Sequence, residues 1–546
     1  MTLNAKQVAA LDLLEQGEEY AAYFFKKATG LVWFDALRER GHFDPSRNPK
    51  PKEAREKGFF TIPQWPALDY LERISHDAAK PENRDYAEKL MGVIRSVTRP
   101  ADAGHRADNY RTWWYFTKIL CILPTEVIST EDIDMFRDWL HSAFDTTLVG
   151  SEIGRSLLPR LLGSTNEDDW WKAARLVEIA TEIRWVERRY QNETVDQEPR
   201  TAVDGHWLRE MFAKNATTLG VKCGRQTIEV LRARLAEVVA REGEDEYSYI
   251  WRPAIESHGQ NQDFRRLRGI LVSALRDVAL SYAKAAARET SMLAIRMLLS
   301  DDLQIVRRLG LYVVNETYEN HGELFWEVLN IELFATNYTH ELYMLLEKRF
   351  KQFSPQGQER VIALIEGLSA EDREGIDREL LTRSIRLKWL HAIKGNGNQH
   401  ADHLYDEYLK TVKYVPEHPE FASYVKSGFV GEVSPISSEK ILSMDVPSIV
   451  TYLREFEGPG GWRAPSEQGL ADALRSAVKQ DPGKFEEQLG AFADVGVPYL
   501  HAILSAFEEL SGEKKPVNWK RILEFCLSVV ESERFWAEPD QEAGSA

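Results

Sequence analysis

The sequence predicts an all-α protein, built as an α-solenoid-like stack of antiparallel helix pairs. Three observations support this prediction. Apolar residues recur with a period near 3.6 along most of the 546 residues. The spacers between the periodic segments are short, which places consecutive helices antiparallel. No Asn-Gly or Asp-Gly turn lies between alternating apolar runs, as a β-hairpin would require. An irregular multi-helix domain is the alternative, because no repeat is visible at a fixed period.

The first distinctive stretch is GFFTIPQWPALDYLERIS, residues 58–75, which ends in a predicted helix. Pro66 suits the first helical turn, where its missing N–H costs nothing. Leu68, Leu71 and Ile74 then form one apolar stripe, with Tyr70 beside it. We expect the preceding apolar side chains to pack as a wedge against neighbouring helices; these are Phe59, Phe60, Ile62 and Trp65. A ligand pocket is the alternative, but no polar groups converge there to orient a ligand.

The clearest helical pattern covers residues 263–287, where Leu267, Ile270 and Leu271 begin a wide apolar stripe that continues through Leu275 and Val278. Further helices are predicted after Thr290 and, with capping residues or short loops between them, over residues 300–319, 323–330, 339–353, 354–368 and 374–395. The Asn-Gly-Asn sequence at 396–398 follows the last of these, so we expect it to cap that helix.

A stretch rich in proline and glycine, residues 415–438, divides the sequence into three parts. We expect a helical-repeat scaffold over residues 1–414, with residues 1–75 as its N-terminal subregion. Residues 415–438 are predicted to form a hinge, and residues 439–546 a smaller acidic helical unit. A long stretch rich in loop-forming residues is also a candidate site for proteolysis.

Charge and cysteine content limit the functional classes. The net charge is −17, and residues 401–546 hold 14 basic and 25 acidic residues, a net charge of −11. This acidic part would repel a phosphate backbone, so we do not expect it to bind duplex DNA. Three cysteines without a pairing pattern, no signal-peptide core and no apolar run of about 18 residues predict a cytoplasmic protein with no membrane contact.

Two kinds of side-chain cluster carry residue types that are used in catalysis or binding. His391, His400, Asp402, His403 and Asp406 include metal-capable groups at helical spacing, but no Cys or appropriately placed Glu accompanies them, so we predict no metal site. The chain has neither a P-loop motif nor a nucleophile elbow. We therefore predict no catalytic residue and no cofactor.

Arginines beside aromatic residues form the second kind of cluster. They are Arg184, Arg188 and Arg189 in RWVERRY (184–190), and Arg265, Arg266 and Arg268 in FRRLRG (264–269). Such helix faces within residues 180–270 would suit RNA or single-stranded DNA. The other interpretation is a helix face whose arginines pair with nearby acids such as Glu182 and Glu187.

Several segments resemble HEAT-like helical-repeat regions of large prokaryotic proteins associated with antiviral defence systems. They include VWFDALRERGHFDP, DDLQIVRRLGLYVVNETYE, HELYMLLEKRFKQFSPQGQERVIALIEG and PVNWKRILEFCLSVVE. The resemblance covers roughly residues 20–75 and 300–535, and the residues between show none. Such regions act as sensors or scaffolds and are often joined to NTPase or effector domains. No enzymatic domain of that kind is recognisable in this chain.

The resemblance implies a non-enzymatic, protein-binding scaffold or regulatory subunit of a bacterial antiviral defence complex. Its expected partner is an effector or enzyme subunit encoded nearby, and partner binding or cleavage in residues 415–438 would switch it. A nucleic-acid-contacting subunit that uses the six arginines is the alternative function.

Overall fold

The computed structural model describes residues 3–190, 193–262, 265–372, 375, 377–424, 433–458 and 465–532, with the backbone alone at 188–190 and 193–196. Helices make up 70% of the chain and strands 3%. The prediction of a mostly helical protein is therefore confirmed.

The chain divides into two compact units, residues 1–424 and 425–546. In the described residues each unit has its own core, from Leu11 to Tyr408 in the first and from Ile441 to Val529 in the second. The division falls within residues 415–438, where a hinge was expected. Residues 415–424 contain neither helix nor strand, and residues 425–432 lie outside the described part. The hinge role of this segment stays a prediction.

The described part of the first unit begins with eleven α-helices. They are α1 (Ala5–Leu14), α2 (Glu18–Lys27), α3 (Phe34–Glu39), α4 (Ala67–Ala78), α5 (Arg84–Thr98), α6 (Tyr110–Ile122), α7 (Thr130–Ile133), α8 (Met135–Leu140), α9 (Thr147–Glu152), α10 (Leu158–Gly163) and α11 (Glu167–Ala180). Helix α4 packs against α2, α5 and α6. Its residues Leu68, Leu71 and Ile74 are buried, as the apolar stripe predicted.

The middle of the first unit is organised by α12 (Gly205–Glu242), a single helix of 38 residues. It packs against α11 on one side and against α14 (Leu267–Ala285) on the other. The two helices approach closely because Gly220 faces α14, where an added Cβ would lie 2.5 Å from the carbonyl oxygen of Val278. The short helix α13 (Ser248–Trp251) lies between them in sequence.

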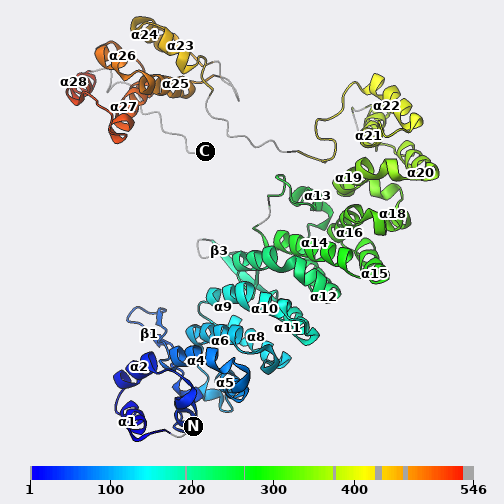
Figure 1. Ribbon diagram of the computed structural model, residues 1–546. Coiled ribbons are helices and arrows are strands. Elements are labelled where there is room, and N and C mark those ends of the chain that lie inside the picture. The colour runs from blue at the N-terminus through cyan, green and yellow to red at the C-terminus, as the bar shows by residue number, and fades with distance from the viewer. Residues whose placement is uncertain are drawn as a thin grey trace. The chain divides into compact units, whose positions relative to one another are not determined.

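The rest of the first unit continues in chain order. Its helices are α15 (Arg288–Leu299), α16 (Gln304–Glu316), α17 (Tyr318–His321), α18 (Glu323–Val328), α19 (Thr339–Arg349), α20 (Pro355–Glu366), α21 (Arg378–Ile393) and α22 (Gln399–Val412). Helix α14 packs against α15 and α16, α16 against α19, α19 against α21, and α21 against α22. Helices that are close in sequence are thus neighbours in space (Figure 1).

The all-α prediction is wrong in two places, because the first unit also contains two antiparallel hairpins. One is β1 (Lys52–Glu53) with β2 (Phe60–Thr61), and the other is β3 (Ile183–Tyr190) with β4 (Glu193–Thr201). Arg184, Arg188 and Arg189 therefore lie on a strand and not on a helix face. Ile183 and Trp185 are half-buried while Arg184 and Val186 are exposed. This alternation suits a strand with one covered face and opposes a helix.

The second unit contains six helices in its described residues. They are α23 (Ser438–Ser443), α24 (Val446–Glu455), α25 (Glu467–Gln480), α26 (Pro482–Glu487), α27 (Val497–Gly512) and α28 (Trp519–Val530). Helix α25 is central, since it packs against α23, α26 and α27. Across the described part of both units, no helix combines the length and apolar character that crossing a membrane requires.

Candidate protein-binding surfaces

The β1–β2 hairpin presents two aromatic side chains to solvent. Phe59 and Phe60 are 61% and 48% exposed, although we expected them to pack against neighbouring helices. Only Trp65, nearer to α4, is buried, at 3%. Phe60 does contact the ring of Phe144, at 5.6 Å between centroids. Phe59 and Phe60 are exposed, contrary to our expectation, because residues 52–61 form a hairpin that places them away from the core.

The base of this hairpin is held by one buried side chain, Asn109. Its Nδ2 donates to the carbonyl of Pro49 at 3.0 Å and to that of Pro63 at 2.9 Å, so it binds both legs of the hairpin. Its Oδ1 meanwhile accepts from the backbone N–H of Arg111 at the start of α6. Asn109 is completely buried. Asn109 therefore caps α6 with its Oδ1 and holds the base of the hairpin with its Nδ2.

Neighbouring contacts strengthen the same base. Buried Asn48 accepts a hydrogen bond from Thr112 Oγ1 at 2.8 Å, and Lys50 Nζ donates to the carbonyl of Gly104 at 2.8 Å. The tip itself carries mixed charge, with three basic residues (Lys52, Arg55 and Lys57) and two acidic ones (Glu53 and Glu56). Glu53 lies directly opposite Phe60 in the strand register.

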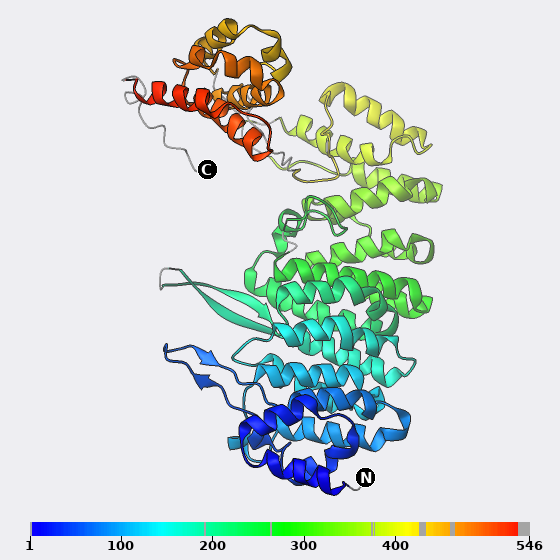
Figure 2. The same cartoon turned by 60° about the vertical axis from the view of Figure 1, so that its left-hand side comes forward.

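The β3–β4 hairpin extends from the same side of the first unit as β1–β2 (Figure 2). Its base is closed by backbone hydrogen bonds from Ala202 to Glu182 and from Val203 to Ala180. The guanidinium of Arg241, in the last turn of α12, lies over the Trp185 ring at 4.2 Å. Exposed Val186 adds a further apolar side chain. The two hairpins and their exposed residues are the first candidate binding surface.

The six arginines lie in two separate segments, one on β3 and one at the start of α14. Arg184 is exposed on β3, where Arg188 and Arg189 also lie, with side chains outside the described part. Arg265 and Arg266 precede α14. Arg268 is buried in α14, where it pairs with Glu242 at 3.0 Å and also with Glu244. Its guanidinium lies 4.5 Å from the centroid of the Trp251 ring. Arg268 is thus engaged inside the protein and not displayed on a helix face.

The histidine cluster near α22 is divided among different partners. His391 Nδ1 is 2.7 Å from the hydroxyl of Tyr343, and His400 Nδ1 is 3.0 Å from Glu359 Oε2. Asp402 accepts from the backbone N–H of Gly395 at 2.7 Å. His403 and Asp406 are exposed. In the described residues, no three His, Cys, Asp or Glu side chains are placed to hold a metal ion.

A pocket of about 300 Å³ in the first unit is lined by several titratable groups. Its lining residues are Glu256, His258, His340, Tyr343, Met344, Glu347, His391, Glu417, Pro419, Glu420 and Phe421. Within it, His340 is 6% exposed, and its Nε2 lies 3.5 Å from Glu256. The ring of Phe421 stacks on His340 at 4.4 Å. Phe421, near the end of the 415–424 segment, therefore holds this segment against α19 by an aromatic contact.

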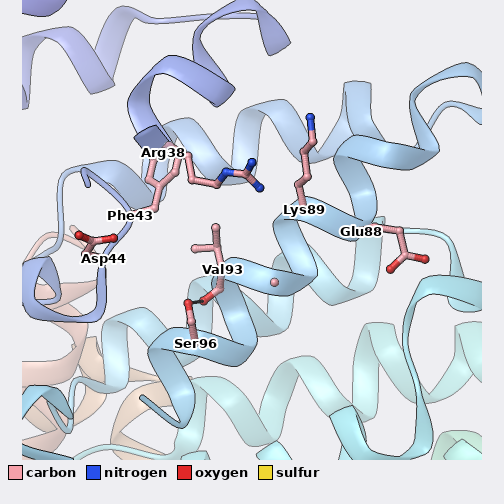
Figure 3. A pocket seen from close by; sticks show the side chains of 8 residues that line it. Arg38, Phe43, Asp44, Glu88, Lys89, Val93 and Ser96 are labelled. Atoms are coloured by element: carbon pink, nitrogen blue, oxygen red, sulfur yellow. Dashed lines mark hydrogen bonds between the residues drawn. The ribbon is translucent and has the colours of Figure 1, made fainter. Parts of the chain in front are cut away.

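A shallower pocket of about 490 Å³ lies beside α3 and α5. Arg38 and Lys89 reach over it from these helices, whereas Glu88 points to the other side (Figure 3). Lys89 donates to Asp35 at 2.8 Å, and this hydrogen bond raises the pKa of the lysine. The hydrogen bond to Asp35 therefore favours the charged form of Lys89 in this pocket. Burial likewise raises the pKa of Cys121 and Cys223 to about 12, which keeps both thiols protonated.

No family model matches this chain, and no curated protein matches its sequence. The arrangement of its own residues must therefore carry the functional argument. Sequence reasoning identified the aromatic stretch at 58–65 but not its exposure. The paired prolines Pro49 and Pro63, which flank a short segment containing Gly58, were the available signal of a hairpin.

Proposed function

We propose that this chain is a protein-binding helical scaffold, a regulatory subunit of a bacterial antiviral defence complex, whose first unit binds a partner protein through the β1–β2 hairpin. The observation that carries the proposal is the Asn109 clamp, which fixes a hairpin whose Phe59 and Phe60 side chains are exposed. Exposed aromatic residues on a fixed support are typical anchors of protein interfaces, because little conformational entropy is lost when they bind.

The charges of the hairpin indicate the chemistry of the partner. Lys52, Arg55 and Lys57 lie in the same hairpin as the aromatic pair and outnumber its two acidic residues, so the matching surface is an apolar recess with acidic residues at its rim. Glu53 and Glu56 lie among these basic residues, and Glu53 is the cross-strand neighbour of Phe60. A carboxylate beside the aromatic ring repels a phosphate backbone, which favours a protein over RNA or single-stranded DNA.

The scaffold part of the proposal includes an α-solenoid-like, HEAT-like arrangement of the first unit. The order of contacts supports it, since α14 packs against α15, α15 against α16, α16 against α19, α19 against α21 and α21 against α22. The defence context rests on the resemblance of roughly residues 20–75 and 300–535 to regions of defence proteins. In this setting the partner is an effector or enzyme subunit.

Comparative affinity purification from a native extract tests partner binding. The full chain and two variants serve as bait: Phe59→Glu with Phe60→Glu, and a control with Tyr20→Glu and Tyr23→Glu on α2. The control tyrosines are similarly exposed, at 54% and 68%. We expect one protein to be retained by the wild type and the control and to fall about tenfold with the hairpin variant. If no captured protein distinguishes the two variants, the hairpin is not the binding surface.

Binding to labelled single-stranded DNA and RNA at 50 and 200 mM salt is measured on the same three proteins. If the wild type and the control bind in a salt-dependent way and the hairpin variant does not, the hairpin binds a nucleic acid and not a protein. All three proteins should melt at similar temperatures, because the substituted side chains are exposed and the Phe60 ring that is lost contacts the half-buried Phe144 and not the core.

The regulatory part of the proposal concerns residues 415–438. We propose that partner binding or cleavage in this segment separates the second unit from the first. The separate cores of the two units support this, as each unit retains its own buried side chains when the connection is lost. Limited proteolysis of the full chain tests it: the first cuts should fall within 415–438, and initial cuts elsewhere would contradict the proposal.

A further inference from the structure

Helix α28 exposes large apolar side chains along one of its faces. Its large apolar side chains Trp519, Leu523, Leu527 and Val530 are 44%, 62%, 59% and 44% exposed. At 100° per residue these four positions fall within about 80° of one another around the helix axis. The core of the second unit is contacted by a different face, formed by Ile522, Phe525 and Val529. Four adjacent large apolar residues on one helix face indicate an interaction surface.

We propose that this face pairs α28 with the α28 of a second copy of the chain, in antiparallel orientation. The size of the side chains favours this orientation. When Leu523 of one copy lies over Leu527 of the other, Trp519 at one end meets the smaller Val530 at the other. In a parallel pair, each Trp519 would instead meet a second Trp519, and the smaller Val530 residues would leave a gap. Facing large and small residues give the closer packing.

The charges beside the face favour the same arrangement. Lys520, Glu524 and Glu531 follow one edge of the apolar face, about 100–140° from Trp519. In an antiparallel pair related by a twofold axis, equivalent edges face each other, so Lys520 of each copy lies next to Glu531 of the other. Glu524 near the axis is balanced by Lys520 of its own helix, 4.0 Å away. A parallel pair would bring this edge against the uncharged edge that contains Cys526.

The size of the contact sets the expected strength of the dimer. One helix pair buries much less than the roughly 1,600 Å² of a standard protein interface. We therefore expect a reversible dimer with a Kd in the micromolar range. This inference does not depend on the proposed hairpin function, because it concerns the second unit and the association of the chain with itself.

Sedimentation velocity of the full chain over a range of concentrations tests the dimer. We expect a monomer–dimer equilibrium for the wild type and a monomer for Leu523→Glu with Leu527→Glu. Leu293→Glu on α15 is the matched control, since that leucine is 59% exposed but belongs to the first unit. Lys520→Glu should raise the Kd about tenfold, because two symmetry-related charge pairs are lost. Adding Glu531→Lys should restore it.

Disulfide trapping tests the orientation in chains that carry Cys526→Ser. A mixture of one chain with Leu523→Cys and another with Leu527→Cys should form linked dimers faster than either chain alone. Faster linkage within the Leu523→Cys chain alone would show a parallel pair and overturn the proposal. A wild type that stays monomeric at every concentration would also overturn it. Dimerisation of a chain truncated after Ser532, with a monomeric full chain, would show that residues 533–546 occupy the face instead, and would also overturn the proposal.

Discussion

Arg308 and Glu341 form a fully buried, two-pronged ion pair in the first unit. The Nε and Nη2 atoms of Arg308 lie 2.7 and 3.1 Å from Glu341 Oε2 and Oε1, and the side chains are 0% and 1% exposed. Arg308 Nη2 also donates to the carbonyl of Arg252, and Glu341 accepts from the backbone N–H of Ile255. The pair thus joins α16, α19 and the segment after α13 into one polar network.

Removing either partner of this pair should destabilise the first unit strongly. We expect Arg308→Ala or Glu341→Ala to lower the free energy of unfolding by about 3–5 kcal/mol, because the remaining charge stays buried without compensation. Chemical denaturation measures this loss. The control is Glu327→Ala, which breaks the exposed Arg296–Glu327 pair and should cost at most about 1 kcal/mol. Equal losses in the two cases would contradict the expectation.

The α12–α14 contact should not tolerate even one added methyl group at Gly220. Gly220→Ala would place a Cβ 2.5 Å from the Val278 carbonyl oxygen and 2.7 Å from Ser281 Cβ. We expect a loss of about 1–3 kcal/mol, visible as a lower melting temperature. Gly92→Ala in α5 should instead stabilise by about 0.5–1 kcal/mol, since no atom lies within 4 Å of its added Cβ. A stabilising Gly220→Ala would show that the helices can separate.

The stability of the first unit should fall as the pH drops below about 6.5, partly because of His321. His321 is 1% exposed, and its ring nitrogens lie 2.8 Å from Ser291 Oγ and 2.9 Å from Thr317 Oγ1. Burial lowers the pKa of His321. The unfolded chain therefore takes up a proton at a higher pH than the folded one, and acid favours unfolding.

Melting temperatures of the wild type and His321→Gln between pH 8 and pH 5 check this expectation. The variant should be less stable at pH 8 and should lose less stability as the pH falls. His42 and His391, whose pKa values burial also lowers, leave part of the pH dependence in place. The same slope in both proteins would exclude His321 as a contributor.

The two units should unfold independently. Leu309 and Leu474 are both fully buried, the first in the core of the first unit and the second in that of the second. We expect Leu309→Ala and Leu474→Ala each to shift only one of two calorimetric transitions, with a cost of about 2–5 kcal/mol. A single transition that both variants shift equally would show one cooperative body.

Loss of the Asn109 clamp should loosen the β1–β2 hairpin. Hydrogen exchange of residues 50–62 should become faster in Asn109→Ala, because both legs lose a side-chain hydrogen bond. Asn166→Ala provides the control, since Asn166 caps α11 through the N–H of Asp168 without holding a hairpin. Unchanged exchange in Asn109→Ala would mean that the hairpin is held by other contacts.

The sequence predicts the helices well where one face is continuously apolar, as in α14, whose Ile270, Leu271 and Leu275 are buried. It fails at the hairpins for two reasons. The β3–β4 hairpin is largely exposed, so its alternation between Ile183, Arg184 and Trp185 is short and weakly apolar. The hydrogen bonds of Asn109 to Pro49 and Pro63 join residues that are 60 and 46 positions apart. No local pattern records such pairings.

The sequence also does not predict which apolar face of α28 packs against the core and which is exposed. The helix is apolar on two faces, since Ile522 and Phe525 are buried while Leu523 and Leu527 are exposed. Periodicity alone does not tell which of two apolar faces meets the core of its own unit. That choice depends on where the neighbouring helices lie.

The unbroken α12 helix has a mechanical consequence. At 1.5 Å per residue its 38 residues span about 57 Å. Helices α9, α10 and α11 pack against the same helix as α14 does. Moving the helices before α12 relative to those after it would therefore require α12 itself to bend. β4 also contacts α12, and Arg241 of α12 lies over the ring of Trp185 on β3. A force on the β3–β4 hairpin is therefore transmitted to α12, and through α12 to the helices that pack on either side of it.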